Sequence, residues 1–144
     1  MAETITLYDH TINRFASGAN AASDTYKLIL CTALTINTTH TQLSQITYTE
    51  VANGNGYTTG GATLQGVNFA QANTTDSRFD ADDVQWTAGS SSLSATHALL
   101  VNTTDANSPP VAAINFDGTK TTPANSLFTV RWNADGIVRF RKPV

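Results

Sequence analysis

The chain has 144 residues, a formal net charge of −3 and only 13% charged side chains, against 40% hydrophobic residues. The acidic balance argues against nucleic-acid binding, which normally needs a basic surface, and no apolar stretch approaches the ~20 residues of a membrane span. Glu3 and Asp9 stand where a signal peptide would be basic, so we expect a soluble protein made in the cytoplasm. A chain of this size folds without a disulfide, and the single Cys31 cannot form one internally. We expect one β domain over residues 1–144.

Residues 1–18 carry a helical pattern. Thr4 or Thr6 can cap a first turn, and Gly18 is a typical residue at a helix end. Four large side chains recur at helical spacing and predict one apolar stripe: Ile5, Tyr8, Ile12 and Phe15. A helix this short is marginal alone and must pack on something. We favour its own sheet, and the alternative is a neighbouring subunit, which would make Tyr8, Ile12 and Phe15 partner-binding residues.

Residues 25–142 carry strand patterns, because neutral polar side chains such as Thr favour strands and turns over helices. The apolar run Tyr26–Cys31 predicts a strand covered on both faces, with Cys31 as a small buried thiol. Thr39 and Gln42 resemble a capping box and predict a helical turn over 39–45. Turn glycines after Asn53 and Asn55 predict a tight reversal.

About eight strands are expected in all, over Tyr26–Cys31, Ile46–Val51, Ala62–Ala72, Arg78–Trp86, Thr96–Thr103, Val111–Phe116, Leu127–Trp132 and Ile137–Arg141. They predict an all-β fold, an antiparallel β-sandwich or jelly-roll-like barrel with a short N-terminal helix.

The last two strands are expected to form a hairpin. A four-residue loop would place Arg139 among apolar residues, whereas a three-residue loop sets Trp132 opposite Val138 and gathers Arg131 and Arg139 on the other face. We prefer the second register. Like charges placed opposite each other are unfavourable, so we hypothesise that a basic stripe meets carboxylates of a partner. The stripe consists of Arg131 and Arg139, joined by Arg141 and Lys142. The alternative is a solvated sheet face.

Motifs that would carry chemistry are weak in this sequence. The histidines lack zinc-ligand spacing, and neither G-x-S-x-G nor S-x-x-K occurs. Asp76, Asp80, Asp82 and Asp83 could hold Ca²⁺, but they lack the EF-hand spacing. The parity of the apolar residues changes there, so we prefer a β-bulge near Asp82 and Asp83. We therefore expect no enzyme, and no catalytic residues, metal or cofactor.

Five stretches carry a family resemblance: LYDHT (7–11), SDTYKL (23–28), EVANGNGYTTGG (50–61), FDADDV (79–84) and WNADGI (132–137). With them the chain resembles small head-decoration (cement) proteins of tailed double-stranded DNA bacteriophages. The resemblance implies a jelly-roll-like domain on the capsid surface of the virion, bound where major capsid protein subunits meet and strengthening the shell against DNA pressure. It also implies a homodimer, with a trimer as the alternative, and supplies no catalytic residues.

Two other functions remain open. A tail or fibre protein, for example a trimeric receptor-binding tip, would need cyclic symmetry along one axis, whereas head decoration suits two-fold dimers or local trimers. A carbohydrate-binding module would need an exposed aromatic platform. Trp86 and Trp132 are expected on the apolar face, so Tyr57 in the Asn/Gly-rich loop is the best exposed candidate.

Overall fold

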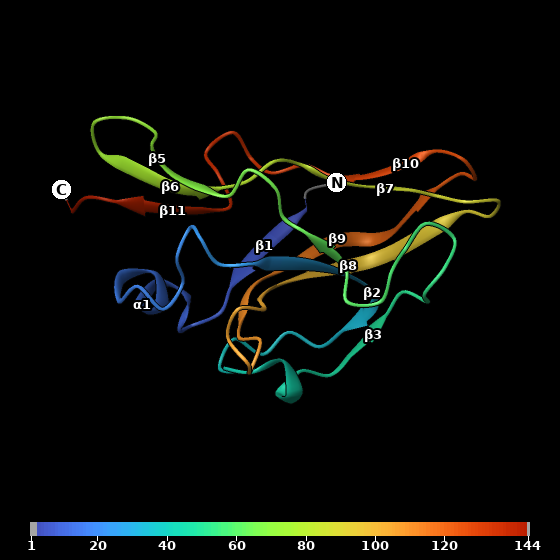
Figure 1. The fold of residues 1–144 in the computed structure, drawn as a ribbon, viewed down its shortest axis with the longest axis horizontal. Coiled ribbons are helices and arrows are strands. Elements are labelled where there is room, and N and C mark those ends of the chain that lie inside the picture. Colours follow the sequence, from blue (N-terminus) through green and yellow to red (C-terminus); the bar gives the residue numbers. More distant parts are fainter. Residues whose placement is uncertain (1–2, 144) are drawn as a thin grey trace.

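The computed structural model describes residues 3–143 and arranges them in two layers of antiparallel strands (Figure 1). The larger layer is a six-stranded sheet in the order β1-β9-β8-β2-β3, with β4 also paired to β2. Its strands are β1 (Thr4–Leu7), β2 (Tyr26–Leu34), β3 (Tyr48–Glu50), β4 (Ala62–Thr63), β8 (Leu93–Asn102) and β9 (Pro110–Thr122). The second layer holds a pair, β7 (Val84–Thr87) and β10 (Leu127–Val130), and a three-stranded sheet in the order β11 (Val138–Arg141), β6 (Asp76–Asp80), β5 (Asn68–Gln71). The prediction of an all-β antiparallel sandwich is confirmed.

The strand count differs from the sequence-based prediction. Residues 3–143 form eleven strands, β1 to β11, rather than about eight. One extra strand is β1, and two more arise because the segments expected at 62–72 and 78–86 each divide into two strands. Strands β4 and β5 pair in different layers, so the chain crosses from one layer to the other between residues 63 and 68.

The predicted C-terminal hairpin is wrong. Strand β10 pairs with β7, and strand β11 pairs with β6. Strands β10 and β11 therefore follow one another along the second layer and do not pair with each other. Residues 131–137 bridge them opposite the break between β6 and β7, at residues 81–83. Trp132 holds this bridging segment against residues 81–83. Its backbone N–H donates to Asp83 Oδ1 (3.0 Å) and its indole N–H donates to the Asp82 carbonyl (3.1 Å). The β-bulge expected near Asp82 and Asp83 is wrong in form, because the segment breaks at residues 81–83 into two strands, β6 and β7, instead of carrying a bulge within one strand.

Strand β2 is covered on both faces, as predicted. Tyr26, Leu28 and Leu30 point into the main core between the two layers. Ile29 and Cys31 alternate with them and belong to a second apolar cluster on the other face of the large sheet, which residues of the 34–48 segment help to cover. The thiol of Cys31 is free and buried, and burial raises its pKa to about 12.

The N-terminal segment is a strand followed by a shorter helix than predicted. Residues Thr4–Leu7 form β1 on β9, so neither Thr4 nor Thr6 caps a helix, and the helix α1 covers only Thr11–Ala16. Three consecutive β-branched residues, Thr4, Ile5 and Thr6, explain the strand, since such residues pack well on a pleated surface. The predicted end of the helix is confirmed, because Gly18 follows it with a φ of +82°.

Two loops refine the local predictions. The helical turn expected over 39–45 is a short 3-10 helix, η1 (Leu43–Gln45), and its capping box is formed by Gln42 and Gln45 instead of Thr39. The predicted reversal at 53–61 is confirmed: Gly54 and Tyr57 exchange backbone hydrogen bonds of 2.7 and 3.0 Å. This reversal folds back against the sandwich and buries Tyr57.

Gly56 offers a test of how closely that reversal packs. A Cβ at Gly56 would overlap the Thr87 carbonyl, whereas a Cβ at Gly54 would meet no atom within 4 Å. Both glycines have positive φ, so alanine carries a similar backbone cost at each. We expect Gly56→Ala to lower the free energy of unfolding by about 1–3 kcal/mol more than Gly54→Ala, as overpacking does. Urea denaturation of both variants measures this, and equal losses would contradict the packing.

Candidate functional site

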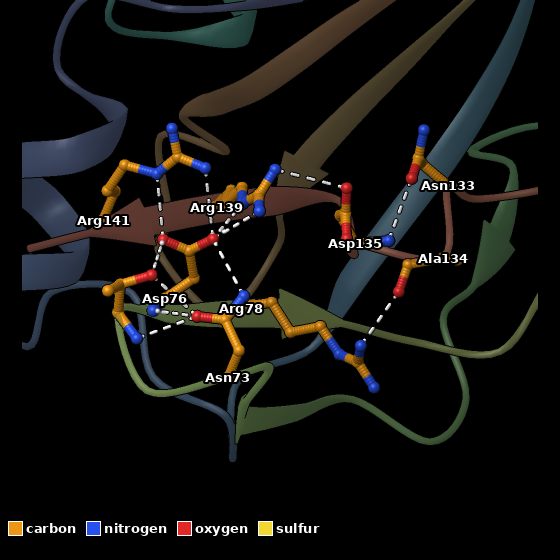
Figure 2. A network of polar contacts seen from close by, with 9 residues as sticks. Asn73, Asp76, Arg78, Asn133, Ala134, Asp135, Arg139 and Arg141 are labelled. Atoms are coloured by element: carbon orange, nitrogen blue, oxygen red, sulfur yellow. Dashed lines mark hydrogen bonds and ion pairs between the residues drawn. The ribbon is translucent and has the colours of Figure 1, made fainter.

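The most concentrated group of charges surrounds Asp76, the first residue of β6 (Figure 2). Its side chain is only 1% exposed. Arg141 lies directly opposite it on β11 and donates from Nε to Oδ1 at 3.0 Å. Arg139 donates to Oδ2 from Nε at 2.8 Å and also from Nη2. One carboxylate therefore binds two guanidinium groups of the same strand.

Local sequence explains how Asp76 is placed. Asn73 accepts hydrogen bonds through its Oδ1 from the backbone N–H groups of Thr75 (2.8 Å) and Asp76 (2.9 Å). Asn favours turns because its side chain makes such bonds with nearby backbone groups. The resulting reversal connects β5 to β6 and directs the Asp76 carboxylate toward β11. The alternation of Arg139 and Arg141 along β11 then puts both guanidinium groups on the same side of the sheet.

Hydrogen bonds stabilise the charged form of Asp76. The bond from Arg141, with those from Arg139 and Asn73, holds the pKa of this carboxyl well below its ordinary value, against the opposing effect of burial. Arg139 also reaches Asp135, with Nη1 to Oδ2 at 3.2 Å. The positive charge of the two arginines is thus largely balanced within the chain.

The predicted stripe of three arginines is divided in the structure. Arg139 and Arg141 come together around Asp76, while Arg131 follows β10, outside the strand pairing that places the other two. The proximity of like charges is therefore explained by an internal carboxylate, and no partner is needed to account for it. Sequence reasoning considered Asp76 only as a possible metal ligand and missed it as the partner of the two arginines, because it paired β11 with the wrong strand. A role of Arg139 and Arg141 in partner binding stays a prediction.

The other acidic residues of the sequence cluster are dispersed. Asp80 lies 3.6 Å from the Arg78 guanidinium and accepts the N–H of Ala81, and Asp83 accepts that of Trp132. Within residues 3–143, no three His, Cys, Asp or Glu side chains lie close enough together to hold a metal ion. In the same part of the chain, no helix has the length and apolar character needed to cross a membrane.

The three apolar residues predicted to bind a partner differ in how far the structure exposes them. Tyr8 is 1% exposed in the second apolar cluster, and Phe15 is 9% exposed in the main core. Ile12 is 44% exposed, so among these three it alone offers a large apolar surface to a partner. The expected single stripe does not exist, because residues before Tyr8 lie in a strand. Packing of the N-terminal helix on its own domain, through Phe15, is confirmed.

Tyr57 is not the exposed platform that a sugar-binding role would need. It is 2% exposed, and its hydroxyl donates to Glu50 Oε1 at 2.7 Å. Burial and this hydrogen bond raise the pKa of its phenol. Trp86 and Trp132 are buried, as predicted. The expectation of an exposed aromatic at Tyr57 is therefore wrong, because the Asn/Gly-rich loop folds inward instead of projecting.

Arg131 lines a shallow depression of about 390 Å³, which could receive a side chain of a partner. It lies where β1, an edge strand of the large sheet, meets the end of β10. Its lining combines apolar and charged side chains: Glu3, Ile5, Arg131, Trp132 and Asn133. Ile5 is 37% exposed and Arg131 is exposed, and no salt bridge of Arg131 occurs within residues 3–143. A partner carboxylate could pair with this arginine beside an apolar contact.

Comparisons with protein-family models, with curated proteins and with solved structures found no match to this chain. The functional interpretation therefore depends on the resemblance of the five stretches named above and on the residues and their geometry. Two features are available for it: an internally balanced cluster at Asp76, and an accessible depression at Arg131.

Asp76→Asn tests the charge balance, with Asp135→Asn as the control because Asp135 contacts Arg139 from an exposed position. We expect Asp76→Asn to lower the melting temperature clearly more at neutral pH. A depressed folded-state pKa gives stability that is complete above the ordinary carboxyl pKa of about 3.9 and is lost as the pH falls below it. The gap between wild type and Asp76→Asn should therefore shrink in acid. A gap independent of pH, or equal effects of both variants, would contradict this role.

Proposed function

We propose that the protein is a non-enzymatic structural component of a phage virion, which binds the outside of the capsid shell and stabilises contacts between major capsid subunits. The observation that carries this proposal is the resemblance of five stretches to head-decoration proteins, above all residues 50–61. Each of these stretches includes turns or strand ends, so the resemblance concerns the shape of the domain. A β-sandwich is compatible with that shape.

The longest of these stretches forms a tightly bonded loop, which supports a structural role. Glu50 Oε1 accepts the hydroxyl of Tyr57 and the backbone N–H of Gly60, at 2.7 and 2.6 Å. Tyr57 in turn accepts the N–H of Leu30 from the centre of β2, at 3.2 Å. The loop is thereby attached to the largest sheet at several points. Such attachment suits a protein whose task is to hold its shape under load.

The depression at Arg131 is the surface that we assign to the capsid partner. A carboxylate of the major capsid protein would pair with Arg131, while an apolar side chain would cover Ile5. An exposed pair of this kind contributes little on its own. Many copies around a shell make modest contacts sufficient, because subunits that contact more than one neighbour gain effective concentration. Arg139 and Arg141 are already bound to Asp76 and would act mainly by holding β11 in place.

Binding to expanded heads of the phage that encodes the protein tests this assignment. We compare wild type with Arg131→Glu and, as a matched charge reversal away from the depression, Lys142→Glu. Co-sedimentation with heads should show binding at least about tenfold weaker for Arg131→Glu and nearly unchanged for Lys142→Glu. Circular dichroism checks that both variants are folded. Failure of wild type to bind heads would contradict the proposed function, whereas binding by both variants would contradict only the choice of surface.

A further inference from the structure

Strand β5 is an edge strand of the second layer, paired on one side only. The order β11-β6-β5 leaves β5 with one neighbour, and it lies at the outer margin of the molecule in Figure 1. Its four residues are Asn68, Phe69, Ala70 and Gln71. A strand edge exposes a row of backbone donors and acceptors, which can bind another strand.

The hydrogen-bond pattern shows which groups of β5 are free. Opposed residues of antiparallel strands alternate between bonded and non-bonded pairs. Ala72 N–H donates to the Asp76 carbonyl at 2.9 Å, so the next bonded pair toward the start of β5 is Ala70 with Arg78. The same alternation holds at Phe79. Its carbonyl accepts the backbone N–H of Ile137 on the β11 side and therefore does not face β5. The N–H and C=O groups of Phe69 and Gln71 therefore point outward.

The side chains of β5 do not protect this edge. Natural proteins protect exposed edges with charged residues or proline. The opposite edge of the same sheet has both, since β11 carries Arg139 and Arg141 and is followed by Lys142 and Pro143. Strand β5 has neither.

Aromatic packing next to β5 adds an apolar contribution. Phe69 is 45% exposed although its ring contacts three other rings. Centroid distances are 5.7 Å to Phe15, 5.4 Å to Phe79 and 6.2 Å to Phe140. With Ala16, three of these rings line an apolar hollow of about 240 Å³: Phe15, Phe69 and Phe140. An added strand would cover the exposed side of Phe69 and remove apolar surface from water.

We propose that β5 pairs antiparallel with β5 of a second copy of this chain, about a two-fold axis that passes beside Ala70. This register sets Phe69 opposite the partner's Gln71 and Gln71 opposite the partner's Phe69. All outward backbone groups of both residues are then bonded. The two three-stranded sheets join into one continuous sheet, β11-β6-β5-β5-β6-β11, and the contact is closed and self-complementary, as two-fold interfaces are.

Self-complementarity of charge and size favours a second copy as the occupant. The paired strands carry no charged side chain, so no like charges are brought opposite each other. Ala70 meets its own symmetry mate at the axis, where the smallest side chain of β5 fits best. The two Phe69 rings are diagonal neighbours on one face of the joined sheet, within the reach of aromatic side chains. This pairing does not depend on where in a virion the protein is found.

Ala70→Glu and Ala70→Gln test the pairing by sedimentation equilibrium of the full chain, whose mass is 15.3 kDa. Arg78 lies opposite residue 70 within one copy, so a carboxylate there suits the folded monomer. Across the axis, however, two carboxylates would oppose each other. We expect dimers for wild type and Ala70→Gln, and at least about tenfold weaker association for Ala70→Glu. A wild type that is monomeric at every concentration, or equal association of both variants, would overturn the proposal.

Ala70→Cys tests the register. Residues 70 of the two copies would form a non-bonded pair with Cα atoms about 4.5 Å apart, which a disulfide can bridge. Asn68→Cys is the control, since its mate would lie more than about 13 Å away along the strand. Cys31 is fully buried and does not compete. Mild oxidation should therefore cross-link Ala70→Cys to a covalent dimer and leave Asn68→Cys largely monomeric on a non-reducing gel. Equal cross-linking of both, or none at Ala70→Cys, would overturn the register.

Discussion

The packing of Phe79 between the two layers is the contact on which the rest of the second layer depends. This ring is fully buried and lies 5.0 Å from the ring of Tyr26 in the large sheet and 4.8 Å from that of Phe15 in α1. Its own backbone carbonyl accepts the N–H of Ile137 at the start of the last segment. One residue thus joins the helix, both layers and the C-terminal segment. Loss of an aromatic ring from such a site typically costs about 3–5 kcal/mol, so the position of β6, and with it that of β5 and β11, depends on this contact.

The Asp76 cluster secures the part of the second layer that Phe79 does not reach. Strand β11 has only four residues and is an edge strand of its three-stranded sheet. Arg139 and Arg141 attach it to β6 through a carboxylate that stays charged. Charged residues are few in this chain, and three of the five salt bridges within residues 3–143 join segments that are far apart in the sequence: Arg14 with Asp105, and Arg139 and Arg141 with Asp76. The other two are local, between Arg78 and Asp80 of β6 and between Arg139 and Asp135. Arg131 differs from these residues in being available to a partner.

Sequence patterns predicted the parts of the fold that depend on local chemistry. The double coverage of β2, the buried Cys31 and the glycine-rich reversal all follow from apolar alternation or from residue preferences. The change of apolar parity near Asp82 marks a break between β6 and β7 instead of the expected bulge. The errors concern which strands lie side by side. Residues 127–141 alternate as a hairpin would, but Trp132 is buried with both of its N–H groups bonded to the segment at Asp82 and Asp83, and this tertiary contact prevents the hairpin. Asp76 could not be predicted as the partner of two arginines, because more than sixty residues separate them along the chain. The prediction for Tyr57 was wrong for a similar reason. The composition of its loop suggests exposure, but the hydrogen bonds of its hydroxyl to the Glu50 carboxylate and to the backbone of β2 hold it in the interior.

A decoration role requires many copies on each particle, whereas a tail or fibre role requires few. The most direct measurement is therefore the number of copies in purified virions, obtained by quantitative mass spectrometry against the major capsid protein. We expect a ratio of about one copy per capsid subunit, or a simple fraction of it set by the symmetry of the shell. A ratio of about a few per cent or less, as the symmetry of a single tail would give, would contradict the capsid role.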